Sequence, residues 1–170
     1  MSTSNSYYFL FNIQLAIIIE NNLAPRHPNF IPRQTQISLS EIFDRNKCVC
    51  VHGLIGMGKK ELACEFGHRL IENESFDVIY AFEFETFEDD FRQFAKELGL
   101  TEETSNSNLR VKDLVRDVQY RLKLLEKRRF LFVFLNVFDS QQIEPYMPCV
   151  FECKNVKLLV TTPNKTSWVK

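Results

Sequence analysis

The stretch that most constrains the fold of this chain is a short glycine-rich loop within residues 52–62, HGLIGMGKKEL. Gly53 and Gly58 bracket the loop, Gly56 lies between them, and Lys59 follows directly. A β-prone run precedes the loop and a helical apolar stripe follows it. Glycines at these positions let backbone N–H groups converge on one small space, and a helix that begins near Lys59 adds the positive end of its dipole. The loop therefore predicts a phosphate-binding site.

One position in the loop departs from what metal-dependent chemistry needs. In a working loop of this kind, a serine or threonine hydroxyl follows the lysine and ligates the Mg²⁺ that bridges the phosphates. Here that position holds Lys60, and Glu61 comes next. Because an ammonium group cannot ligate a cation, the sequence predicts a loop that holds phosphate but holds metal poorly. The alternative interpretation is a glycine turn that caps an ordinary helix.

Length, composition and charge exclude several classes of function. The 170 residues suffice for one α/β domain, and 45% apolar with 25% charged residues is ordinary for a globular protein. A net charge of −1, with basic residues scattered among acids, argues against a nucleic-acid-binding surface. The apolar run over residues 7–19 is too short to span a membrane, and no Lys or Arg precedes it. We therefore expect a cytoplasmic protein without nucleic-acid or membrane partners.

The five cysteines predict reduced, buried thiols, because their number is odd and the chain shows no export signal. Cys149 and Cys153 are spaced like half of a metal site, but no second Cys/His pair has a matching spacing. We therefore expect no bound metal.

Strand and helix patterns alternate along most of the chain. Strands are expected over residues 47–52, 76–84, 130–137 and 156–161. Helices are expected over residues 38–43, from residue 59 onward, over 86–99 with Thr86 and Gly99 as caps, and over 111–125. This alternation predicts a three-layer α/β fold like that of P-loop NTPases, with a parallel sheet flanked by helices. The ligand crevice is expected at the carboxyl edge of the strands.

The first part of the chain carries a different pattern. In residues 1–23 the apolar spacing suits either a strand or a helix, and we favour a helix. Three prolines favour an extended linker over residues 24–36. We divide the chain into an N-terminal hydrophobic segment with its linker, residues 1–29, and a nucleotide-binding domain, residues 30–170. We expect this domain to be incomplete at its C-terminus and the chain to be a fragment.

Over residues 30–165 the chain resembles the NB-ARC domain, a nucleotide-binding domain of the STAND class of P-loop signal-transduction ATPases in apoptosis and immune-receptor proteins. The segments that resemble the family's entry motif, phosphate loop, metal-binding strand and sensor strand are residues 30–34, 53–59, 132–137 and 158–162. The resemblance implies binding of ADP or ATP and a role as a signalling switch or interaction domain. It also implies protein partners or a longer multidomain protein. The residues expected to contact the nucleotide are Arg33, Gly53, Gly56, Met57, Gly58, Lys59, Lys60 and Glu61.

The departures from the family pattern fall on catalytic positions. Lys60 replaces the metal-binding hydroxyl, the strand acid falls on Leu135, and the sensor arginine falls on Pro163. An alternative alignment takes Asp139 as the acid. We assign no catalytic residue and expect a pseudo-ATPase that binds nucleotide without requiring Mg²⁺. The alternatives are an active P-loop ATPase or a small-molecule kinase of the same superfold.

Overall fold

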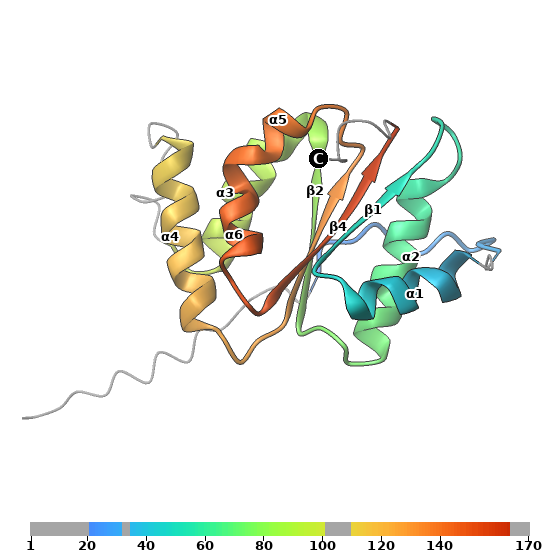
Figure 1. Ribbon diagram of the computed structural model, residues 1–170, viewed down its shortest axis with the longest axis horizontal. Coiled ribbons are helices and arrows are strands. Elements are labelled where there is room, and N and C mark those ends of the chain that lie inside the picture. The colour runs from blue at the N-terminus through green and yellow to red at the C-terminus, as the bar shows by residue number, and fades with distance from the viewer. Residues whose placement is uncertain (1–20, 32–34, 101–109, 164–170) are drawn as a thin grey trace, which may run out of the picture.

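A parallel four-stranded sheet forms the central layer of the computed structural model, with strands in the order β1-β4-β3-β2 (Figure 1). The structure describes residues 21–31, 35–100 and 110–163. The strands are β1 (Cys48–His52), β2 (Val78–Glu83), β3 (Phe130–Leu135) and β4 (Val156–Thr162). The prediction of a three-layer α/β fold with a parallel sheet is confirmed.

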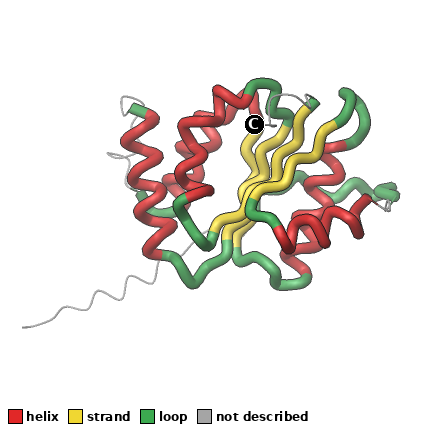
Figure 2. The backbone as a smooth tube through the Cα atoms, viewed as in Figure 1, coloured by secondary structure: helices red, strands yellow, loops and turns green. Residues whose placement is uncertain are grey.

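Helices cover both faces of this sheet (Figure 2). One face packs against α1 (Thr35–Arg45) and α2 (Lys59–Glu72), and the other against α3 (Phe87–Glu97), α4 (Val111–Leu124) and α6 (Met147–Phe151). The three phenylalanines of β3 face the second layer, while its Leu131, Val133 and Leu135 face the first. A continuous apolar run suits such a strand, because both of its faces are buried.

Phe82 lies at the centre of an aromatic core between β2, β3 and α3. Its ring centroid is 5.3 Å from that of Phe87, 5.2 Å from Phe132 and 5.4 Å from Phe134. The side chain of Phe82 is fully buried. The pair with Phe87 is stacked and the other two are edge-on, and such pairs add to the free energy gained from apolar burial alone.

The sequence analysis does not predict three short elements between β3 and β4. They are α5 (Ser140–Ile143), the 3₁₀ turn η2 (Glu144–Tyr146) and α6. Each is shorter than the window over which a helical apolar period is visible. Their buried residues nevertheless belong to the core on the α3 and α4 side of the sheet.

Helix ends differ in detail from the predictions. Helix α1 begins at Thr35, so the linker predicted to run to residue 36 ends earlier, and the helix predicted over residues 38–43 is too short. Thr86, the last residue of the 3₁₀ turn η1 (Phe84–Thr86), occupies the N-cap position of α3 without a side-chain cap. Its hydroxyl donates instead to the Asp90 carboxylate at 3.1 Å. Gly99, with φ of 76°, ends α3 as predicted, because this left-handed conformation favours glycine.

The segment that leads into α1 is tied to the domain by specific contacts. Asn21 forms a parallel β-bridge with Ile79, and the side-chain amide of Asn22 pairs with both backbone groups of Ala81, at 2.9 and 2.6 Å. Leu23 is buried against α2 at Gly67, where an added Cβ would lie 2.7 Å from a Leu23 methyl carbon. The helix expected over residues 1–23 lies outside the described residues, except at residues 21–23, where the bridge replaces it. The division of the chain after residue 29 stays a prediction.

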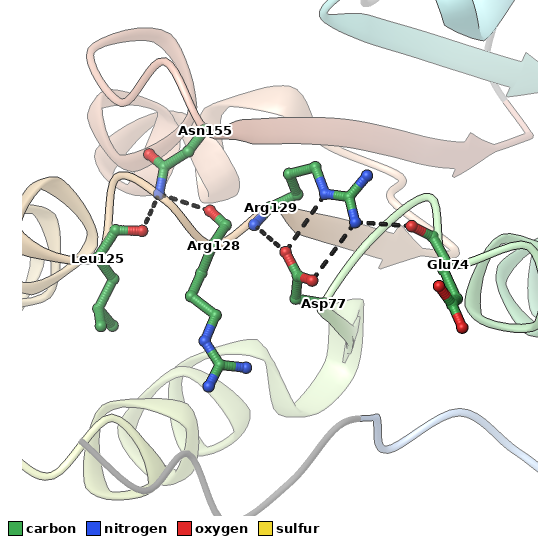
Figure 3. Close-up of polar contacts among 6 residues, drawn as sticks. All are labelled: Glu74, Asp77, Leu125, Arg128, Arg129 and Asn155. Atoms are coloured by element: carbon green, nitrogen blue, oxygen red, sulfur yellow. Dashed lines mark hydrogen bonds and ion pairs between the residues drawn. The ribbon is translucent and has the colours of Figure 1, made fainter. Parts of the chain in front are cut away.

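Polar contacts secure the amino edge of the sheet, opposite the glycine loop (Figure 3). Arg129 forms an ion pair with Asp77 and donates to the carbonyl oxygen of Glu74 at 2.6 Å. This pairing lowers the pKa of the Asp77 carboxyl below its ordinary value, since the hydrogen bonds from Arg129 favour its charged form. The amide of Asn155 donates to three backbone carbonyls, those of Leu122, Leu125 and Arg128, at 3.1, 3.0 and 3.0 Å. The turn between α4 and β3 is thereby attached to both β2 and β4.

All five cysteines are free thiols. Cys149 and Cys153 are buried under α4, where their Sγ atoms lie 3.5 and 3.7 Å from the backbone carbonyl oxygens of Val115 and Gln119. Within residues 21–31, 35–100 and 110–163, no group of three or more His, Cys, Asp or Glu side chains is placed to hold a metal ion. Among the described helices, none has the length and apolar character that crossing a membrane requires.

Candidate functional site

The glycine loop joins the carboxyl end of β1 to the first turn of α2. Gly56 and Gly58 have φ values of 83° and 72°, in the left-handed region that L side chains rarely adopt. Gly58 is the N-cap of α2, so it offers no side chain to the first N–H groups of that helix. A Cβ on Gly56 would meet no atom within 4 Å, so the space above it is open. The backbone conformation therefore favours glycine at both positions, and at Gly56 crowding plays no part.

Lys59 lies folded over the same loop. Its ammonium donates to the carbonyl oxygens of Gly53 and Leu54, both at 2.8 Å. These contacts hold the charge beside the N-terminus of α2, where an anion also gains from the helix dipole. The loop thus presents one positioned ammonium, open space and a helix N-terminus on the same side.

A cavity of about 800 Å³ opens over the loop. Of the eight residues predicted to contact a nucleotide, Gly56, Gly58, Lys59, Lys60 and Glu61 line it. Of the remaining three, two are not part of the lining and one lies outside the described residues. Gly53 holds the Lys59 ammonium, Met57 is more than half exposed and is not part of the lining, and Arg33 lies outside the described residues.

The opposite wall of the cavity contains residues that the sequence prediction missed. Glu83 ends β2, Glu85 follows it, and Asn136 follows β3. All three lie at the carboxyl edge of the sheet, where the crevice of a parallel α/β fold opens. Acidic residues directly after a buried strand were the available signal, and that signal lies in the FEFE run of residues 82–85.

Lys60 and Glu83 form an ion pair across this cavity. The hydrogen bond from Lys60 to the Glu83 carboxylate raises the pKa of Lys60, which keeps the side chain protonated. Both side chains are partly exposed, at 41% for Lys60 and 35% for Glu83. The Lys60 ammonium is therefore held at the end of β2, in the lining of the larger cavity.

Of the other two substituted positions, only Pro163 lies at the cavity. Leu135 is buried in the core on the α1 and α2 side, and Pro163 lines the cavity. Asn136 has a positive φ of 55°, and its backbone N–H donates to the Thr161 hydroxyl at 2.9 Å. Asp139, the alternative acid, caps α5 by accepting from the N–H of Gln141 at 2.9 Å and is not part of the cavity lining.

A second cavity, of about 310 Å³, adjoins the N-terminus of α2. Phe30 and Ile31, from the segment before α1, line it together with Gly58 and Glu61. Ile31 is 78% exposed, so this apolar side chain is available to a ligand. The two cavities share the first turn of α2 as a common wall.

A family model described as the NB-ARC domain matches residues 33–166. The matched region includes the glycine loop, all four strands and every residue described above as lining the larger cavity. A search of the curated proteins finds no match to this chain.

Proposed function

The chain belongs to the NB-ARC family of nucleotide-binding signalling domains, and we propose that it binds ADP or ATP over its glycine loop without hydrolysing it. The observation that carries this proposal is the cavity over Gly56 and Gly58, with the Lys59 ammonium at its edge. A phosphate placed there receives a charge-assisted hydrogen bond from Lys59 and faces the N-terminus of α2. The open space at Gly56 admits a phosphate close to the backbone.

The base of the nucleotide is proposed to lie in the smaller cavity, beside Phe30 and Ile31. This cavity shares Gly58 and Glu61 with the larger one, so a phosphate chain can run from one to the other. Its apolar lining suits the face of a purine ring. Arg33 is proposed as a further contact, as the family resemblance implies.

We propose that the site does not require a Mg²⁺ ion. Mg²⁺ needs oxygen ligands in nearly octahedral geometry, whereas Lys60 supplies an ammonium and Leu135 a methyl-bearing side chain. Pro163, at the expected position of the sensor arginine, supplies neither a charge nor an N–H donor. These three positions support a domain that retains nucleotide without metal-assisted phosphoryl transfer. They weigh equally against an active ATPase and a small-molecule kinase.

We also propose that the domain works as a switch or interaction module within a longer protein or with a protein partner in the cytoplasm. The support is the family itself, whose members are signalling domains.

Titration calorimetry with ADP tests the site. Lys59→Ala is expected to weaken ADP binding at least tenfold, which is about 1.4 kcal/mol, because a bound phosphate loses its ammonium partner. The matched control is Lys127→Ala, which removes an ammonium from the exposed turn between α4 and β3 at the opposite edge of the sheet. Equal dissociation constants for the wild type and Lys59→Ala would refute the assignment. Mg²⁺-dependent phosphate release that Lys59→Ala abolishes would establish the ATPase instead.

A further inference from the structure

The Lys60–Glu83 ion pair joins two elements that the glycine loop does not otherwise connect. Lys60 lies in the first turn of α2, and Glu83 is the last residue of β2. The backbone N–H of Glu83 donates to the Asp90 carboxylate at 2.8 Å, which ties this strand end to α3. The carboxylate that faces Lys60 therefore comes from a backbone position held from the other side of the sheet.

Strand register places Glu83 beside the position where the family's strand acid is missing. Glu83 of β2 pairs with Leu135 of β3 in the parallel ladder. Register partners in a parallel pair direct their side chains to the same face of the sheet. Leu135 faces the layer of α1 and α2, and Glu83 meets Lys60 of α2 on that face. The family's acid is thus absent from β3, but the neighbouring strand β2 carries a carboxylate, Glu83, at the paired position.

Stability does not account for this pair. A partly exposed Lys–Glu pair contributes about 0–1 kcal/mol to folding, because water screens the charges and two side chains lose freedom. Both residues line the larger cavity, so the pair lies where the nucleotide is proposed to bind. Its effect is to hold a positive charge in the cavity lining and to neutralise the Glu83 carboxylate.

We propose that Glu83 is a positioning residue that holds the Lys60 ammonium in place of a metal ion, so that the site accepts nucleotide phosphate without Mg²⁺. This inference rests on the proposed nucleotide-binding function. It has a sharp consequence, because a hydroxyl at position 60 would leave the Glu83 carboxylate without its ammonium partner. Hydroxyl and carboxylate oxygens are ligands that Mg²⁺ prefers. Replacing Lys60 by threonine therefore converts the site to Mg²⁺ dependence, and Glu83 is the residue responsible.

The test measures ADP binding by calorimetry in MgCl₂ and in EDTA, after allowing for the free ADP that Mg²⁺ sequesters. The wild type and Glu83→Gln are each expected to give the same dissociation constant in both buffers. Lys60→Thr is expected to bind at least tenfold more tightly in MgCl₂ than in EDTA. Lys60→Thr combined with Glu83→Gln is expected to lose that difference.

The matched control combines Lys60→Thr with Glu85→Gln, because Glu85 lines the same cavity but is not the ion-pair partner of Lys60. This control is expected to retain the Mg²⁺ dependence of Lys60→Thr. Lys60→Ser serves as a second hydroxyl variant, and unliganded melting curves check that each variant folds.

Two results would overturn the inference while leaving the proposed function intact. In one, the wild type binds ADP but Lys60→Thr shows no preference for MgCl₂. In the other, removing Glu83 leaves the Mg²⁺ dependence of Lys60→Thr unchanged. A wild-type chain that binds no ADP in either buffer would instead refute the proposed function, and this inference with it.

Discussion

Gly58→Ala should weaken both the fold and the nucleotide site, since Gly58 has a left-handed backbone with φ of 72° and ψ of 31°. Holding an alanine in this conformation costs about 1–2 kcal/mol. Alanine also restricts the unfolded chain, which returns about 0.4–1 kcal/mol. The net loss is about 1 kcal/mol, or a fall in Tm of roughly 2–4 °C for a domain of this size.

Substitutions at two other glycines distinguish the effect of backbone strain from an effect on ligand binding. Gly99 has a φ of 76° at the end of α3, so Gly99→Ala is expected to lower Tm by a similar amount without changing ADP affinity. Gly53 does not have a positive φ, and its nearest neighbour to an added Cβ is the Lys59 side chain at 3.9 Å. Gly53→Ala should therefore leave the free energy of unfolding within about 0.5 kcal/mol of the wild type.

Thermal denaturation followed by circular dichroism measures the stability of the three variants, and calorimetry with ADP measures their affinity. Compared with Gly53→Ala, only Gly58→Ala is expected to have both a lower Tm and a weaker affinity for ADP. The reasoning fails if Gly58→Ala melts at or above the wild-type temperature, or if Gly53→Ala is destabilised as strongly.

Three further changes test the fold by denaturant unfolding. Phe82→Ala is expected to lower the free energy of unfolding by about 3–5 kcal/mol, because it opens a cavity in the aromatic core. Phe151→Ala, at an exposed position, should lower it by less than about 0.5 kcal/mol. Equal losses of stability in the two variants would contradict this packing. Asn155→Ala should cost about 1–3 kcal/mol, since three backbone carbonyls lose a donor, and an unchanged midpoint would count against those contacts. The folded-state pKa of Asp77 is depressed, so its ion pair stabilises the fold above the unfolded pKa of about 3.9, and this stabilisation disappears as pH falls through the folded value. The deficit of Asp77→Asn at pH 7 should therefore shrink on acidification, and a deficit independent of pH would refute the pairing.

Much of the larger cavity was predictable from local sequence, because its main parts are neighbours along the chain. The glycine loop and Lys59 follow one another within a few residues, and their spacing alone indicates converging N–H groups. The continuous apolar run of β3 likewise indicates a buried parallel strand. Positions where the family pattern fails, such as Lys60 and Leu135, are visible in the same way.

Contacts between distant segments required the tertiary structure. Glu83 is 23 residues from Lys60 in sequence, and no local pattern indicates that the end of β2 would meet the start of α2. Their contact depends on strand order and register, which place β2 beside β3 and Glu83 beside Leu135. The same applies to Asn22, which closes the edge of β2 at Ala81.

The sequence by itself determined the fold class and the glycine-rich, lysine-bearing loop between β1 and α2, because both follow from residue spacing over one or two adjacent elements. Only the tertiary structure decided which side chains face that loop, because those side chains arrive from strands whose order is set by packing across the whole sheet. Short elements such as α5 and α6 fall in the same category. They are stabilised by burial against α4 and the sheet rather than by a helical period of their own.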